Sequence, residues 1–180
     1  MTASFLLALR PPVPVAARVV AFRQAHGVRD AAATPHITLK ARSGLSPDLT
    51  WGPAVQAVAA AAQPVEVKLG GPRLFPGNRA LYLAARSPGA VALHLALLDA
   101  LKPAQRFGYE GAHMTPHLSL TLGRRGLDLP ALLAAAQTTF EDLDREPLRF
   151  LADALTLMRK AGPGAPYVPV NDWPLGPPRA

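Results

Sequence analysis

The hydrophobic and polar positions along the chain predict strands and helices in an order that occurs twice: strand, helix, strand, helix, strand. The first series has predicted strands at residues 4–10, 35–41 and 65–69 and predicted helices at residues 14–27 and 49–63. The second series has predicted strands at residues 79–85, 116–122 and 148–158 and predicted helices at residues 88–101 and 129–140. We therefore expect an α+β fold built from two similar β-α-β-α-β lobes.

The connecting segments contain turn signals but no linker. Gly and Pro predict turns at residues 70–72 and 76–78, and residues 141–146 form an acidic turn. A last short strand is predicted at residues 167–170. We expect one domain over residues 1–180, with a first lobe at about 1–77, a second at about 78–172 and a proline-rich tail at 173–180 that has no reason to pack.

One hexapeptide occurs in both series, as Thr-Pro-His-Ile-Thr-Leu at residues 34–39 and as Thr-Pro-His-Leu-Ser-Leu at residues 115–120. Alternate side chains of a strand share a face, so each copy has an apolar back and a His-x-hydroxyl front. The histidine lies at a similar distance from its neighbouring strands in both series, which indicates a duplicated lobe. An approximate two-fold axis would bring the two fronts together, so we expect antiparallel sheets that flank a central cleft.

The composition favours a soluble protein with an anionic partner. The 180 residues include 19 Lys and Arg against 12 Asp and Glu, for a net charge of +7, and 49% of them are apolar. This charge suits nucleic acid, a nucleotide or a membrane surface, although a solvated basic surface is the simpler alternative. No cysteine is present, which excludes disulfides, thiolate metal sites and cysteine nucleophiles. No apolar run has the length of a signal or a membrane span, so we expect a cytoplasmic protein.

The two histidines of the paired motif can act as an acid and a base in one site, because imidazole titrates near neutral pH. A neutral His36 or His117 can take a proton from an attacking hydroxyl, and the other, when protonated, can give a proton to a leaving oxygen on the opposite side of a phosphorus atom. The hydroxyls of Thr38 and Ser119 can donate to a phosphate oxygen. Two histidines without a nearby carboxylate make a poor divalent metal site, so we expect neither a metal nor another cofactor.

Other polar and aromatic residues are weaker candidates. Lys40 shares the strand parity of Thr38 and could contact phosphate, or it could be a solvated strand end; Arg124 and Arg125 could act from the loop after the second motif. Tyr82, Phe107 and Tyr109 could stack on a base, although aromatic residues are more often part of a core. His26 and His94 are expected to be a capping and a packing residue, and His113 to lie in a loop.

These motifs resemble those of the two-histidine (2H) phosphoesterase superfamily, and within it the bacterial 2′-5′ RNA ligase and cyclic phosphodiesterase branch. The resemblance covers almost the whole chain and rests on the two His-x-Thr/Ser motifs and the doubled lobe. It implies that His36 and His117 are catalytic and that Thr38 and Ser119 hold the phosphate. It also implies opening of 2′,3′-cyclic phosphates without a metal, or joining of such an end to a 5′-hydroxyl as a 2′,5′ link without ATP.

Three hypotheses follow from the sequence. The leading one is a metal-independent phosphoesterase or ligase that acts, as a monomer, on RNA ends or on nucleotides with a cyclic phosphate. The alternatives are an RNA- or nucleotide-binding module with little turnover, and a structural domain whose histidines form hydrogen bonds in a core. Neither the direction of the reaction nor the assignment of the acid and the base to the two histidines follows from the residues.

Overall fold

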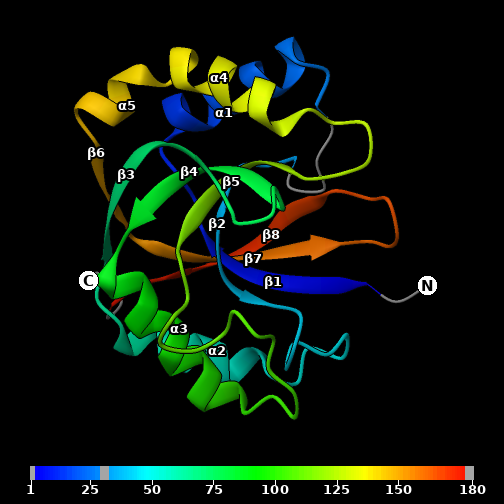
Figure 1. The fold of residues 1–180 in the computed structure, drawn as a ribbon. Helices are drawn as coiled ribbons and strands as arrows, with labels where there is room; N and C mark the ends of the chain where they lie inside the picture. The colour runs from blue at the N-terminus through cyan, green and yellow to red at the C-terminus, as the bar shows by residue number, and fades with distance from the viewer. Residues whose placement is uncertain (1–2, 29–32, 177–180) are drawn as a thin grey trace.

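The computed structural model describes residues 3–28 and 33–176. Its elements follow the doubled order of the sequence (Figure 1). The first series is β1 (Ser4–Leu9), α1 (Val13–Ala25), β2 (Ile37–Ala41), α2 (Gly52–Ala61) and β3 (Val65–Leu74). The second is β4 (Ala80–Arg86), α3 (Pro88–Leu101), β5 (His117–Leu122), α4 (Leu129–Thr139), α5 (Glu141–Arg145) and β6 (Leu148–Ala152), and it is followed by β7 (Ala154–Lys160) and β8 (Tyr167–Pro174).

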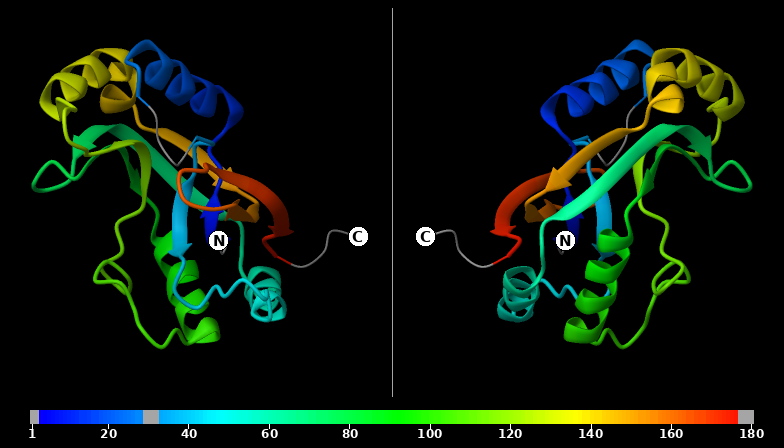
Figure 2. Two further views of the ribbon diagram at one scale, coloured as in Figure 1. Left: turned by 90° about the vertical axis from the view of Figure 1, so that its right-hand side faces the viewer. Right: turned by 90° about the vertical axis from the view of Figure 1, so that its left-hand side faces the viewer.

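The eight described strands form one antiparallel sheet in the order β6-β3-β4-β5-β2-β1-β7-β8. Only Asp153 separates β6 from β7, yet β6 pairs with β3 while β7 pairs with β1 on the other half of the sheet. The sheet must therefore curl strongly. Helices α1, α4 and α5 lie on one side of it and α2 and α3 on the other (Figures 1 and 2). The predicted α+β class with antiparallel strands is confirmed, with one curled sheet in place of separate sheets.

The strand registers repeat between the two lobes. Thr38 pairs with Ala8 and Lys40 with Leu7, so that Leu39 is an extra, bulged residue of β2. In the second lobe, Ser119 pairs with Tyr82 and Thr121 with Leu81, so that Leu120 is the bulged residue of β5. A β-bulge places two residues opposite one and re-aims the side chains beside it. Because the same irregularity falls at the same motif position in both lobes, the internal symmetry extends to the backbone.

Local sequence explains the positions of the elements. Ile37, Leu39, Leu118 and Leu120 of the motif strands are all buried in the core, as the alternating pattern requires. Helices α3 and α4 begin at the caps Ser87 and Asp128, whose side chains accept hydrogen bonds from the backbone N–H groups of Ala90 and Ala131. A proline lies in the first turn after each cap, at a position where its missing N–H costs nothing.

Several predicted elements differ from those of the structure. Residues 70–72 continue β3 through a bulge, and Gly71 lies so close to Asp144 that a Cβ atom would sit 2.2 Å from its carboxyl carbon. The acidic segment at 141–146 is the helix α5, and the strand predicted at 148–158 is broken at Asp153. The tail predicted at 173–180 is packed at its start, because β8 extends to Pro174 and Leu175 is buried; residues 177–180 lie outside the described residues.

Candidate active site

The two motifs meet where the lobes join. Strands β2 and β5 are neighbours. Ile37 of β2 pairs with Leu118 of β5 across the boundary between the two lobes, which we call the seam. Both of these side chains are fully buried, so the residues on either side of them face the opposite way. Extended by one step in each direction, this antiparallel register puts His36 opposite Ser119 and Thr38 opposite His117. In an antiparallel sheet, such diagonal positions as those of the two histidines are about 7–8 Å apart. The register therefore gathers both His-x-hydroxyl fronts on one face.

Each imidazole is oriented by the same local contact. Nδ1 of His36 lies 2.7 Å from the carbonyl oxygen of Thr34, and Nδ1 of His117 lies 2.9 Å from that of Thr115. A carbonyl oxygen only accepts hydrogen bonds, so Nδ1 carries the hydrogen in both rings and Nε2 is the nitrogen that exchanges a proton. The intervening proline has a fixed φ angle and keeps the threonine before it extended. The sequence Thr-Pro-His thus sets the tautomer of both rings.

The surroundings of the two rings differ. Phe75 and Tyr82 stack on each other with ring centroids 4.1 Å apart, and both present an edge or face to His117, at 4.9 and 5.5 Å. This burial lowers the pKa of His117, although the bond to the Thr115 carbonyl opposes the shift. The ring of His36 has Tyr167 at 6.5 Å, and the Tyr167 hydroxyl lies 3.1 Å from Oγ of Ser4. Neutral imidazole is therefore favoured at His117.

The two predicted phosphate-binding residues lie beside the rings. Ser119 Oγ is buried, and within the described part of the chain it has no hydrogen-bond partner. Buried hydroxyls nearly always have a partner, so an unsatisfied one calls for an explanation. Thr38, its symmetry counterpart, is half-buried. A phosphate oxygen placed between the two motifs would accept the hydrogen bond that Ser119 lacks.

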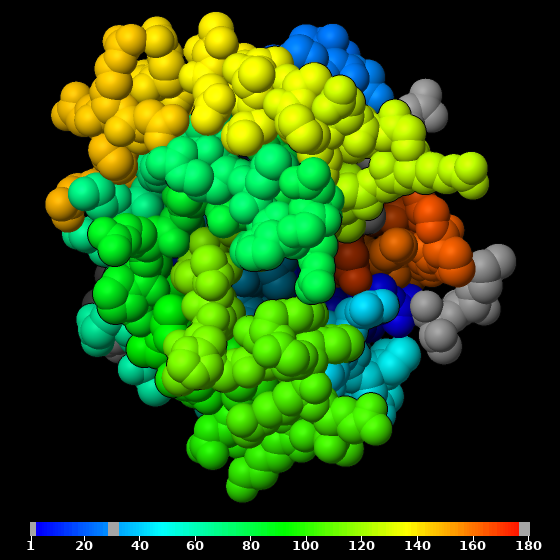
Figure 3. Space-filling model, in the orientation of Figure 1, coloured from blue at the N-terminus to red at the C-terminus, as the bar shows by residue number. Residues whose placement is uncertain are grey.

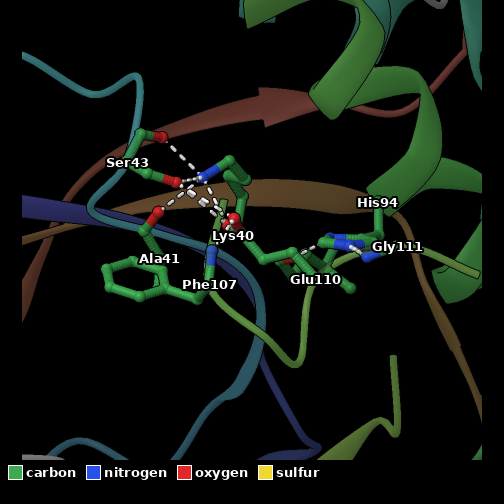
Figure 4. A network of polar contacts seen from close by, with 8 residues as sticks. Lys40, Ala41, Ser43, His94, Phe107, Glu110 and Gly111 are labelled. Atoms are coloured by element: carbon green, nitrogen blue, oxygen red, sulfur yellow. Dashed lines mark hydrogen bonds and ion pairs between the residues drawn. The ribbon is translucent and has the colours of Figure 1, made fainter. Parts of the chain in front are cut away.

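Lys40 does not lie free in the cleft, which contradicts its predicted contact with phosphate. Its side chain is fully buried, and Nζ donates to Glu110 Oε1 at 2.6 Å and to both oxygens of Ser43 (Figure 4). Glu110 also accepts from the N–H of Phe107, so the ion pair fastens the loop at residues 102–116 to β2. Burial alone would raise the pKa of Glu110, but the hydrogen bonds from Lys40 and Phe107 and the charge of Lys40 hold it below its usual value.

The remaining candidates have varied positions. Arg124 and Arg125 are exposed after β5, where a role in substrate binding stays a prediction. Tyr82 contacts His117, whereas Phe107 and Tyr109 stack on each other at 5.3 Å in the loop at 102–116. His26 ends α1 and His113 is exposed in a loop, both as expected.

His94 is buried, as expected of a packing residue, but it also bonds to the backbone of β2. Buried Arg23 was missed, because nothing in the local sequence distinguishes it from the other arginines of a basic chain.

The surface of the molecule has a hollow at this place. Figure 3 shows it with a floor in the colour of β2 and a rim formed by the β3–β4 connection, β5 and the loop at 102–116. A separate groove of about 570 Å³ lies between α2, α3 and the start of β3, and none of its lining residues belongs to a motif. Among the described residues, no group of three His, Asp or Glu side chains is placed to hold a metal ion.

Comparisons with known proteins agree with this architecture. The structure is similar to those of TT0787 from Thermus thermophilus (18% identity, 98% of this chain and 100% of that chain, TM-score 0.64) and of E. coli LigT complexed with phosphate (18%, 96% and 97%, 0.60). It is also similar to E. coli LigT complexed with 3′-AMP (16%, 98% and 99%, 0.62). At these identities, the likeness concerns the fold.

The sequence itself matches no curated protein, but it matches a family model over residues 11–164. No helix in the described part of the chain has the length and apolar character needed to cross a membrane. The resemblance to the two-histidine phosphoesterases is confirmed, because the matched model covers most of the chain: the protein belongs to the 2′-5′ RNA ligase superfamily.

Proposed function

We propose that the protein opens 2′,3′-cyclic phosphates at RNA ends or on nucleotides, with His36 and His117 as a general acid–base pair. The observation that carries this proposal is the doubled geometry: two imidazoles with the same fixed tautomer, on neighbouring strands, each with a hydroxyl two residues further along. Membership of the superfamily supports a phosphoesterase or ligase type of activity. The substrate class is our inference from the chemistry of the site.

The proposed reaction needs one neutral and one protonated imidazole. Nε2 of the neutral ring takes a proton from water as the water oxygen bonds to phosphorus. The bond from phosphorus to the ribose O3′ breaks, and Nε2 of the protonated ring gives its proton to that oxygen, which leaves a 2′-phosphate. A 5′-hydroxyl in place of water would give a 2′,5′ link in the same geometry. The lowered pKa of His117 favours it as the base in the hydrolytic direction.

The hydroxyls of Thr38 and Ser119 bind the two non-bridging oxygens of the phosphate in this proposal. The unsatisfied Oγ of Ser119 supports this role, since a bound phosphate would supply the missing acceptor. Donors that are held in place before the reaction stabilise the charge that develops in the transition state, and they require no reorganisation. The net charge of +7 favours the approach of an anionic substrate.

The test is hydrolysis of a nucleoside 2′,3′-cyclic phosphate in the presence of EDTA. We expect turnover by the unmodified protein and a loss of roughly 10²–10⁴-fold in kcat for His36→Ala and for His117→Ala, which is the usual contribution of general acid–base catalysis. His26→Ala, at the exposed end of α1, is the matched control and should keep full activity. Chelator-sensitive turnover, or full activity in either motif variant, would contradict the proposal.

An RNA-binding module is the alternative, and the basic charge supports it equally well. Such a protein would bind RNA with an affinity that falls steeply with salt, since phosphate contacts release counterions. It would give no product after long incubation with either cyclic phosphates or RNA ends. The same assay therefore separates the two functions.

A further inference from the structure

The bulged residues of the two motif strands leave backbone groups that need partners outside the sheet. Leu39 has no opposite residue in β1, and Leu120 has none in β4. Across the seam, the pair formed by Ile37 and Leu118 joins β2 to β5 in the described structure. Buried carbonyl groups without a partner are costly. The hydrogen bonds that the carbonyls of Leu39 and Leu120 accept therefore identify the side chains that hold the motif strands in place.

Arg23, on α1 of the first lobe, reaches the motif of the second lobe. The residue is 5% exposed, and its Nε donates to the Leu120 carbonyl at 2.9 Å while one terminal nitrogen donates to the Ser119 carbonyl at 2.7 Å. The other terminal nitrogen donates to the carbonyl of Ala33 at 3.2 Å, just before the first motif. One rigid guanidinium fork thus ties the bulge of β5 to the segment that leads to His36.

His94, on α3 of the second lobe, makes the reciprocal contact with the first lobe. The residue is 1% exposed, and its Nδ1 donates to the Leu39 carbonyl at 2.5 Å. Its Nε2 accepts from the N–H of Gly111 at 2.9 Å, which places the ring between β2 and the loop at 102–116 (Figure 4). Each lobe therefore supplies, from its first helix, one buried side chain that holds the bulge carbonyl of the other lobe.

We propose that Arg23 and His94 are positioning residues that set the spacing of the two His-x-hydroxyl fronts. A bulge fixes the direction of the side chains beside it, here Thr38 and Ser119, and the crosswise bonds fix the bulges relative to each other. Catalysis by a paired site depends on this spacing, because a displacement of about 1 Å can cost roughly 10²-fold in rate. The expected effect on kcat rests on the proposed function, whereas the expected effect on the positions of the two motifs does not depend on turnover.

For His94, two isosteric substitutions separate its two bonds. His94→Asn places an amide nitrogen where Nδ1 lies and keeps the donor to Leu39, whereas His94→Gln places its oxygen where Nε2 lies and keeps the acceptor for Gly111. We expect kcat for cyclic phosphate hydrolysis to fall less than about fivefold in His94→Asn and about 10- to 100-fold in His94→Gln. Equal activities, or a more active His94→Gln, would overturn the positioning role, because the bond to the Leu39 carbonyl would then contribute nothing to the rate.

For Arg23, we expect Arg23→Met to lower kcat about 10- to 100-fold, and Arg23→Lys, which lacks the fork, to lower it several-fold. Arg18→Met is the matched control, because Arg18 lies on the same helix and donates hydrogen bonds to Asp142 and Thr139, away from the motifs. If Arg23→Met does not fold, the Arg23→Lys variant decides, provided that it melts cooperatively. A folded Arg23 variant with kcat within twofold of the unmodified protein, or no lower than that of Arg18→Met, would overturn the role.

The imidazole resonances of His36 and His117 give a readout that needs no turnover. We expect His94→Gln to shift mainly the signals of His36, and Arg23→Met mainly those of His117, with Arg18→Met shifting neither. If the unmodified protein hydrolyses no cyclic phosphate, the proposed function fails while these shifts still test the positioning. Unchanged signals in both variants would overturn the positioning even if the enzyme is active.

Discussion

Ser119 carries a buried hydroxyl for which the described part of the fold supplies no hydrogen-bond partner. Its carbonyl is held by Arg23, whereas its buried Oγ has no partner among the described residues. A hydroxyl that was present for stability would make an internal bond. We interpret the unsatisfied Oγ as a donor kept for a ligand, in agreement with the motif that predicted its place beside His117.

Replacing Ser119 by alanine should therefore separate binding from stability. We expect the free energy of unfolding to change little, because Ser119→Ala removes no internal hydrogen bond. We expect the affinity for inorganic phosphate to fall roughly 10- to 100-fold, which corresponds to the loss of a hydrogen bond to a charged group worth about 1.5–3 kcal/mol. Calorimetric titration and urea unfolding measure the two quantities, and unchanged phosphate affinity would remove Ser119 from the site.

Two desolvated imidazoles also make stability depend on pH. Burial lowers the pKa of His94 and of His117 below the usual 6.5, so in the folded state both stay neutral where the unfolded chain takes up protons. The contribution of these rings to the free energy of unfolding should therefore be fully present above about pH 6.5 and decrease as the pH is lowered below that value. Urea unfolding at pH 7.5 and 5.5 measures this, and the loss should be smaller in His94→Asn. Equal stability at the two pH values would contradict the lowered pKa of both rings.

At the scale of elements, the loop at 102–116 is held by an ion pair that the sequence does not reveal. Lys40 follows the first motif, and the strand pattern predicted that it would share the face of Thr38. The bulge at Leu39 breaks that alternation, and the partner, Glu110, lies in a distant loop. Local periodicity cannot show either feature, because both depend on contacts between the lobes.

Removing one partner of the Lys40–Glu110 ion pair should destabilise the protein more than replacing both partners by apolar residues. We expect Glu110→Gln to lower the free energy of unfolding by about 3–5 kcal/mol, since it leaves the Lys40 charge buried and unpaired. A double variant with Lys40→Met and Glu110→Leu should recover most of this loss. Urea unfolding of the three proteins tests the expectation. A loss below about 1 kcal/mol in Glu110→Gln would mean that Lys40 reaches water.

At the scale of the whole molecule, duplication explains why the sequence predicted that the two motifs lie together. Two copies of one motif fix the tautomers of both histidines through local contacts, and the doubled order of elements places the copies on neighbouring strands. The long-range features could not be inferred in the same way. The break at Asp153 that curls the sheet and the crosswise bonds of Arg23 and His94 arise only when the lobes pack together.

In the proposed site both imidazoles contact a single anion, and a titration with inorganic phosphate, followed through the resonances of His36 and His117, tests this arrangement. One site between the two rings predicts that both sets of signals shift with the same midpoint, and that His36→Ala weakens the response of His117. Shifts at only one ring, or two different midpoints, would contradict a shared site and with it the proposed acid–base pair.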